Sequence, residues 1–149
     1  MIQRIQTIYL LIVAVVMIAM VFFPLGYLYP EGGGVSMFDA FGMHGQDHAL
    51  TWFLFVLPVS SLLLSVLTIF FYKRRKLQIK LGYLTLFIIV LIYIVGIFFL
   101  WELKQQHPAT ISFTIICIFP LIAFILEALA IRGIKKDEKL IRSLNRLRP

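Results

Sequence analysis

Four long apolar stretches dominate the pattern of hydrophobic and polar positions along the chain. They cover residues 5–23, 52–72, 81–101 and 111–131. Each has roughly the 20 mainly apolar residues that a helix needs to cross about 30 Å of hydrocarbon at about 1.5 Å per residue. Backbone polar groups need internal partners in lipid, and none of the stretches alternates like a barrel strand. The pattern therefore predicts four transmembrane helices.

The connections between these stretches predict an antiparallel bundle. Residues 102–109 form a turn short enough to make the third and fourth helices antiparallel neighbours. Pro24 ends the first helix, and an outer loop follows over residues 25–50. Three consecutive glycines in this loop, at positions 32–34, leave a small interfacial hairpin open as an alternative to an irregular loop. We expect a single domain over residues 1–149, an all-α membrane protein.

Composition supports this class. Hydrophobic residues make up 61% of the chain and charged residues 14%, whereas an ordinary soluble domain is roughly 45–50% apolar and about 25% charged. A water-soluble chain of 149 residues could not bury that much apolar surface. The apolar stretches use most of the length, so no separate soluble catalytic module is expected.

The basic residues predict the orientation of the bundle. Of 14 lysines and arginines, five lie in residues 73–80, seven in the tail 132–149, and one is Arg4 before the first helix. Lys104 alone lies on the other side. The positive-inside rule therefore places both termini in the cytoplasm. The net charge of +7 then favours binding to anionic lipid head groups on that side, and no nucleic-acid partner is expected because the basic runs lack aromatic residues.

Two helix faces carry small or polar residues. Ser61, Ser65 and Thr68 in the second helix lie at positions i, i+4 and i+7. Such a line predicts a face packed against other helices, with a hydroxyl-lined substrate path as the alternative. In the third helix, Gly82 and Gly96 lie on one face with Ile89 between them, at heptad spacing. This face predicts the close approach of a neighbouring helix.

Glu127 is the only residue of the four stretches that is charged at pH 7. Small residues share its helix face, namely Pro120, Ala123 and Ala130. The carboxylate is therefore predicted to face the bundle or a partner subunit rather than lipid. We expect an ion pair near the cytoplasmic helix ends with Arg132, Arg4 or Lys73, or hydrogen bonds from the polar start of the first helix. A partner contact and proton or ion handling are the alternatives.

The tail predicts a separate amphipathic helix. Gly133 is expected to end the fourth helix, and Asp137 to cap the start of a new one. Its apolar face comprises Leu140, Ile141, Leu144 and Leu147, and its polar face comprises Lys139, Arg142, Asn145 and Arg146. Such a helix either lies on the inner leaflet or docks onto a cytoplasmic partner.

Metal and catalytic chemistry are weakly represented. The outer loops hold the potential zinc ligands Asp39, His44, Asp47, His48 and His107. No strict ligand motif appears, and two glycines near His44 disfavour a helix that would align it with His48. No phosphate-binding loop, dinucleotide fingerprint or hydrolase motif is present. We therefore expect no metal, no cofactor and no enzymatic activity.

The two ends of the chain are similar to those of a known family. The opening MIQRIQTIYL and the closing RGIKKDEKLIRSLNRLR resemble an integral-membrane family of the Bacteroidota catalogued as domain of unknown function 4293 (DUF4293). The resemblance extends over the whole chain in length and four-span layout. It implies a multi-pass protein of the bacterial inner membrane, and it transfers no activity and no catalytic residue.

Two functions follow as hypotheses. The first is a non-enzymatic accessory or scaffold subunit that binds other membrane-protein subunits of a larger inner-membrane complex. The second is a small oligomeric transporter or channel that uses the Ser/Thr face of the second helix together with Glu127.

Overall fold

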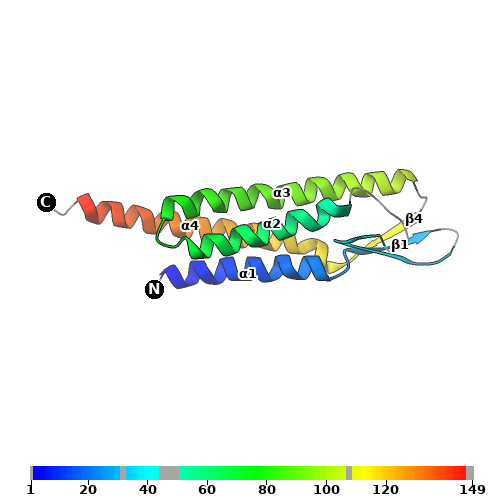
Figure 1. Ribbon diagram of the computed structural model, residues 1–149, viewed down its shortest axis with the longest axis horizontal. Helices are drawn as coiled ribbons and strands as arrows, with labels where there is room; N and C mark the ends of the chain where they lie inside the picture. The colour runs from blue at the N-terminus through cyan, green and yellow to red at the C-terminus, as the bar shows by residue number, and fades with distance from the viewer. Residues whose placement is uncertain (1, 31–32, 44–50, 107–108, 147–149) are drawn as a thin grey trace.

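Four helices run side by side along the long axis of the molecule (Figure 1). They are α1 (Ile2–Phe22), α2 (Thr51–Phe70), α3 (Arg75–Gln106) and α4 (Phe119–Arg146). The computed structural model describes residues 2–30, 33–43, 51–106 and 109–146. Helix α1 packs against α2 and α4, and α3 packs against the same two helices. The predicted antiparallel bundle is confirmed, and its four helices are long and apolar enough to cross a membrane, which indicates a multi-pass membrane protein.

Helices α2 and α3 are joined by a turn over residues 71–74. The carbonyl of Arg74 already accepts hydrogen bonds from the backbone N–H groups of Leu77 and Gln78, at 2.9 and 3.1 Å. Most of the basic segment 73–80 is therefore helical and forms the first turns of α3. These turns lie beside the second half of α4 (Figure 1). We call residues 73–80 and 132–146, with the start of α1, the basic end of the bundle.

A four-stranded antiparallel sheet covers the opposite end. Its strands are β1 (Gly26–Pro30), β2 (Ser36–Asp39), β3 (Gly42–Met43) and β4 (Ala109–Phe113), in the order β3-β2-β1-β4. The expectation of an all-α chain is therefore wrong, whereas the hairpin left open for the outer loop is confirmed as β1 and β2. Gly33 and Gly34 have φ angles of 85° and 95°, which residues with a side chain rarely adopt.

Strand β4 corrects the start of the fourth apolar stretch. The apolar pattern predicts that residues 111–113 belong to a membrane helix, but they pair with β1, with Tyr27 opposite Ser112. A 3-10 turn, η1 (Ile115–Ile118), follows before α4 begins. The alternation of Thr110, Ile111, Ser112 and Phe113 has the period of two that is typical of a strand. Because this strand directly precedes a long apolar run, the apolar pattern places the start of the fourth helix too early in the chain.

Helix α4 does not end at Gly133. It continues without a break to Arg146, so the separate amphipathic helix and the capping role of Asp137 are both wrong. A Cβ atom at position 133 would lie 2.9 Å from Cγ of Gln6. Glycine is therefore present because α1 approaches closely, not because the helix stops. The last turns of α4 extend beyond the start of α1 and of α3 (Figure 1).

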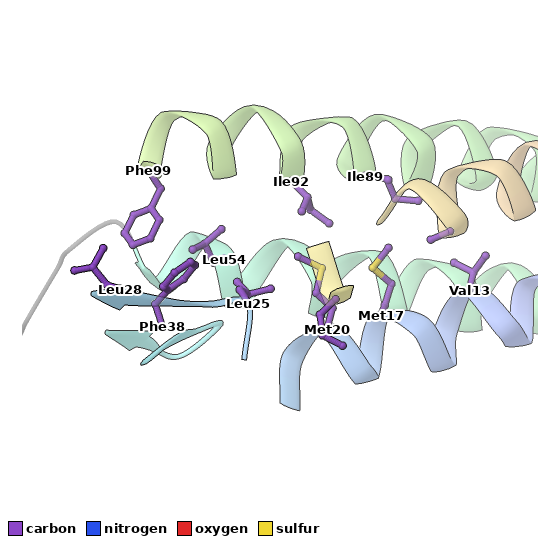
Figure 2. Close-up of a cluster of buried hydrophobic side chains, with 12 residues drawn as sticks. Val13, Met17, Met20, Leu25, Leu28, Phe38, Leu54, Ile89, Ile92 and Phe99 are labelled. Carbon is purple, nitrogen blue, oxygen red and sulfur yellow. The ribbon is translucent and has the colours of Figure 1, made fainter. Parts of the chain in front are cut away.

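The apolar core lies in the half of the bundle next to the sheet. Figure 2 shows side chains from α1, α2 and α3 meeting side chains from the strands. Phe38 of β2 faces Phe99 of α3, with ring centroids 6.3 Å apart. The labelled residues are Val13, Met17, Met20, Leu25, Leu28, Phe38, Leu54, Ile89, Ile92 and Phe99. The sheet is therefore packed onto the helix ends and belongs to the same core.

Candidate functional site

The half of the bundle nearer the basic end buries polar side chains as well as apolar ones. Five side chains there are fully buried, at 0% exposure, and we call them the polar interior: Ser61, Ser65 and Thr68 of α2, Thr85 of α3 and Glu127 of α4. The prediction that the Ser/Thr line of the second helix is a buried face is confirmed. The position of Glu127 inside the bundle, on a stripe of small residues, is confirmed as well.

The hydroxyl groups of the polar interior are of two kinds. Thr68 and Thr85 donate to the carbonyls of Leu64 and Leu81, at 2.7 and 3.0 Å, so their own helices satisfy them. The hydroxyl oxygens of Ser61 and Ser65 have no hydrogen-bond partner within the described parts of the chain. A buried polar group without a partner is uncommon in proteins. These two serines are therefore candidates for contacts beyond their own helix.

A hydrogen bond from a side chain of α3 to the backbone of α2 shows which residues of the two helices lie at the same level. Gln78 Nε2 donates to the carbonyl of Thr68 at 2.8 Å. Because the two helices are antiparallel and rise equally per residue, Ser65 lies level with Leu81, the neighbour of Gly82, and Ser61 lies level with Thr85. The unpartnered serines and the glycine of α3 therefore lie at similar depths in the bundle.

Glu127 lies at this depth as well. A Cβ atom on Gly82 would be 2.7 Å from Cγ1 of Ile131 and 3.3 Å from Oε1 of Glu127. The close approach predicted at Gly82 is confirmed, and it is α4 that approaches. The absence of a side chain at position 82 leaves room for the carboxylate.

The prediction that Glu127 forms an ion pair with Arg132 or Lys73 is wrong. Both carboxylate oxygens are buried without a hydrogen-bond partner among the described residues, whereas Arg132 and Lys73 are exposed. Five residues along a helix correspond to roughly 500° of rotation, so Arg132 points about 140° away from Glu127. Gln6, at the polar start of α1, bonds to another residue. The side chain of Arg4 lies outside the described residues.

Gly96 does not have the role predicted for it. No atom of the described residues lies within 4 Å of a Cβ atom built at this position, so no described helix approaches closely there. Gly96 instead lines an apolar cavity of about 150 Å³ near the sheet, together with Tyr93, Cys117 and Pro120. The phenol of Tyr93 donates to the carbonyl of Cys117 at 3.1 Å, which links α3 to η1.

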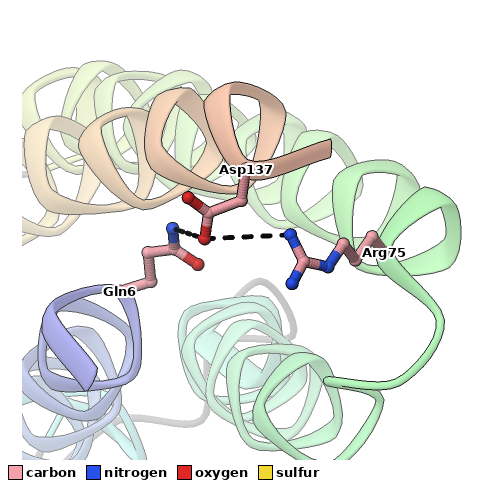
Figure 3. Close-up of polar contacts among 3 residues, drawn as sticks. All are labelled: Gln6, Arg75 and Asp137. Carbon is pink, nitrogen blue, oxygen red and sulfur yellow. Dashed lines mark hydrogen bonds and ion pairs between the residues drawn. The ribbon is translucent and has the colours of Figure 1, made fainter. Parts of the chain in front are cut away.

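Sequence reasoning missed a buried polar cluster at the basic end. Gln6 of α1 donates from Nε2 to Oδ2 of Asp137 in α4 at 2.8 Å, and a guanidinium nitrogen of Arg75 in α3 lies 3.9 Å from the same oxygen (Figure 3). One carboxylate thus ties three helices together. The sequence does contain an indication of this cluster. Positions 127, 130, 134 and 137 have helical spacing and lie on one face of a helix that continues through Gly133. All four of these residues are buried.

The predicted tail surface is partly described. Lys139, Leu140 and Ile141 are exposed on α4, with exposed fractions of 49% for Leu140 and 42% for Ile141. Arg142, Leu144 and Arg146 belong to the helix, but their side chains lie outside the described residues, as does Leu147 altogether. The exposed part of this surface therefore combines one cation with two apolar side chains.

The potential metal ligands do not form a described site. Asp39 Oδ1 accepts a hydrogen bond from the backbone N–H of Phe41 at 2.8 Å, at the turn between β2 and β3. The other four, His44, Asp47, His48 and His107, lie outside the described residues. In the portion of the chain that the structure describes, no three His, Cys, Asp or Glu side chains are grouped as metal ligands.

Comparison with known proteins assigns the chain to a family. The model of a family described as "Domain of unknown function (DUF4293)" matches residues 2–147. The chain belongs to this family, as the resemblance of its two ends implied. No curated protein and no solved structure matches.

Proposed function

We propose that this chain, a member of a family whose description assigns no activity, is a non-enzymatic accessory or scaffold subunit of a larger complex in the bacterial inner membrane. The end of α4 carries this proposal. Leu140 and Ile141 are adjacent apolar side chains, both substantially exposed, on a helix that extends past its neighbours (Figure 1). Such a helix suits docking into an apolar groove of a partner protein.

The continuity of α4 favours a protein partner over the lipid surface. A helix that lies on a leaflet runs in the plane of the membrane, whereas membrane-spanning helices cross that plane. Helix α4 would need a bend to do both, and it has no break between Phe119 and Arg146. Its end therefore projects from the bundle, where a groove can receive it.

The charges around this surface indicate the chemistry of the partner. Lys136 and Lys139 are exposed on the same turns as Leu140 and Ile141. An apolar groove with an acidic rim would complement both features. Thirteen of the 14 basic residues lie at this end of the bundle or in the tail beyond it, so the positive-inside rule places the contact on the cytoplasmic side.

The test is purification of the tagged protein at native expression level in mild detergent, with mass-spectrometric identification of the proteins that travel with it. We expect a stoichiometric larger membrane complex. The double variant Leu140→Gln/Ile141→Gln should lose that complex and keep the thermal unfolding of the isolated chain, since both side chains are already half exposed. The control Lys104→Gln changes an exposed lysine near the sheet, away from this surface, and should retain the complex.

Two results would contradict the proposal. Recovery of the wild type alone, or only as a homo-oligomer, would overturn the role of accessory subunit. A complex that survives the double variant would leave an accessory role but would remove the end of α4 as its docking surface.

The polar interior favours a second candidate, a small oligomeric transporter or channel. Glu127, Ser61 and Ser65 are buried at similar depths without hydrogen-bond partners among the described residues. Ionisable side chains inside membrane helices commonly mark ion or proton paths. Glu127→Gln separates the candidates: a transporter should assemble normally and lose flux in liposomes, whereas an accessory subunit should lose assembly or abundance.

A further inference from the structure

Two adjoining grooves flank the first turns of α3 at the basic end. The first has a volume of about 580 Å³ and is lined by Lys73, Arg74 and Ile141, among others. The second has a volume of about 530 Å³, and its lining includes Lys135 and Lys139 of α4. Lys76 and Lys80 line both grooves. The two grooves therefore share a pair of ammonium groups, one helical turn apart.

The positive charge of these grooves is largely uncompensated. Arg75 is the cation that lies against Asp137, and Lys135 lies over the ring of Tyr83, 4.8 Å from its centroid. Arg74, Lys76 and Lys80 have no ion-pair partner within the described ranges. Among the described residues that line the two grooves, Glu138 is the one acidic residue. Such a cluster of cations attracts an anion that carries more than one charge.

The apolar part of the lining indicates that this anion is attached to a lipid. Leu77 and Ile141 line the first groove, and Ile79 lines the second. From Leu81 onward the sequence of α3 is almost entirely apolar. The grooves therefore lie at the boundary between a charged helix end and a membrane-spanning segment, which is the level of lipid head groups. A soluble phosphate compound would make no use of the adjoining apolar surface.

We propose that these grooves bind the head group of a phospholipid that carries two phosphates, with one phosphate in each groove and Lys76 and Lys80 between them. Basic pockets between membrane helices are suited to polyanionic head groups of this kind. The proposal goes beyond the role of accessory subunit, because the site is formed by α3, α4 and the turn before α3 in one chain and needs no partner protein.

The experiment uses the purified full chain in mild detergent, titrated with tetraoleoyl cardiolipin, with bound lipid counted by native mass spectrometry. Dioleoyl phosphatidylglycerol, which has one phosphate, and inorganic pyrophosphate are the comparison ligands. We expect one cardiolipin per chain, bound more tightly than phosphatidylglycerol and not displaced by pyrophosphate. Lys76→Gln/Lys80→Gln should weaken cardiolipin binding about thirtyfold, or about fivefold for each lysine.

Two control variants make the result specific. Lys76→Arg/Lys80→Arg keeps both charges and should retain most of the binding, while Lys104→Gln removes a lysine near the sheet and should change nothing. The single variants Lys76→Gln and Lys80→Gln provide the same test if the double variant does not fold.

Three outcomes would overturn the proposal. Equal cardiolipin binding by the wild type and Lys76→Gln/Lys80→Gln would exclude these grooves as the site. Phosphatidylglycerol bound as tightly as cardiolipin would exclude the assignment of two phosphates. Displacement of cardiolipin by an equal concentration of pyrophosphate would show that the grooves select a soluble phosphate compound.

Discussion

The two halves of the bundle are enclosed by the same four helices, but the fully buried polar side chains gather in only one of them among the described residues. Next to the sheet, residues such as Met17 and Ile92 meet side chains from the strands in an apolar core (Figure 2). Nearer the basic end, the helices bury Ser65, Thr85 and Glu127 at 0% exposure. Both halves contain fully buried side chains, so the difference lies in the interactions that hold each half together.

In the proposed membrane setting, the surroundings of each half account for this difference. Leaving water stabilises apolar side chains, but leaving lipid for a helix interface gives them no comparable gain. The strands contribute Leu28 and Phe38, and Leu25 directly before β1 joins them, in a core that the sheet covers, so burial from water stabilises that half. The other half depends on contacts that lipid cannot replace. These are the close approaches at Gly82 and Gly133 and the bond from Gln6 to Asp137.

The largest expected effect tests the core next to the sheet. Phe38→Ala should lower the free energy of unfolding by about 3–5 kcal/mol, since it removes a buried ring and leaves a cavity against Phe99. Denaturant titration in mild detergent, followed by circular dichroism, measures the change. Phe22→Ala is the control, because that ring is 73% exposed. If both variants changed the free energy of unfolding by the same small amount, burial of Phe38 under the sheet would not stabilise the protein.

The second prediction compares two glycines of the same helix. Gly82→Ala should destabilise the bundle by about 1–3 kcal/mol, because the new Cβ atom would overlap with Ile131 in a packed interface. Gly96→Ala should be neutral or stabilising by up to about 1 kcal/mol, since alanine favours the helix and the position is open. Thermal unfolding of both variants in one detergent checks the difference. Matching effects would show that close helix approach does not distinguish the two halves.

The sequence predicted the features that depend on long apolar stretches and on helix periodicity. The four helices, the buried face of Ser61, Ser65 and Thr68, and the inward position of Glu127 follow from the spacing of residues on a helix. The closely packed position of Gly82 follows in the same way. Each of these predictions needs only one helix and its 3.6-residue period.

The missed features depend on contacts between distant segments. Strand β4 exists because residues 109–113 pair with β1, about 80 positions earlier in the chain, and an apolar window cannot detect that pairing. Glycine is common at the end of a helix, which is why Gly133 predicts a helix end. In the structure it instead leaves room for the side chain of Gln6. The partner of Asp137 required knowing that the starts of α1 and α3 lie beside α4. Gly82 and Gly96 share a face in sequence, but only one of them meets a neighbouring helix.

The smallest expected effect is that of removing the hydroxyl groups of the polar interior, which distinguishes this region from the apolar core. If the hydroxyls of Ser61 and Ser65 lack partners, each buries a polar group without compensation, and removing that group relieves its desolvation cost. Ser61→Ala and Ser65→Ala should then leave the free energy of unfolding unchanged or raise it by up to about 1 kcal/mol. Thr68→Val is the control, and it should lower stability by about 0.5–1.5 kcal/mol, because the hydroxyl of Thr68 donates to the carbonyl of Leu64. Destabilisation by Ser65→Ala that matches or exceeds this control would show that the hydroxyl is bonded in the folded protein. Glu127, buried at the same depth, would then be the first partner to test, by combining Ser65→Ala with Glu127→Gln in a double-mutant cycle.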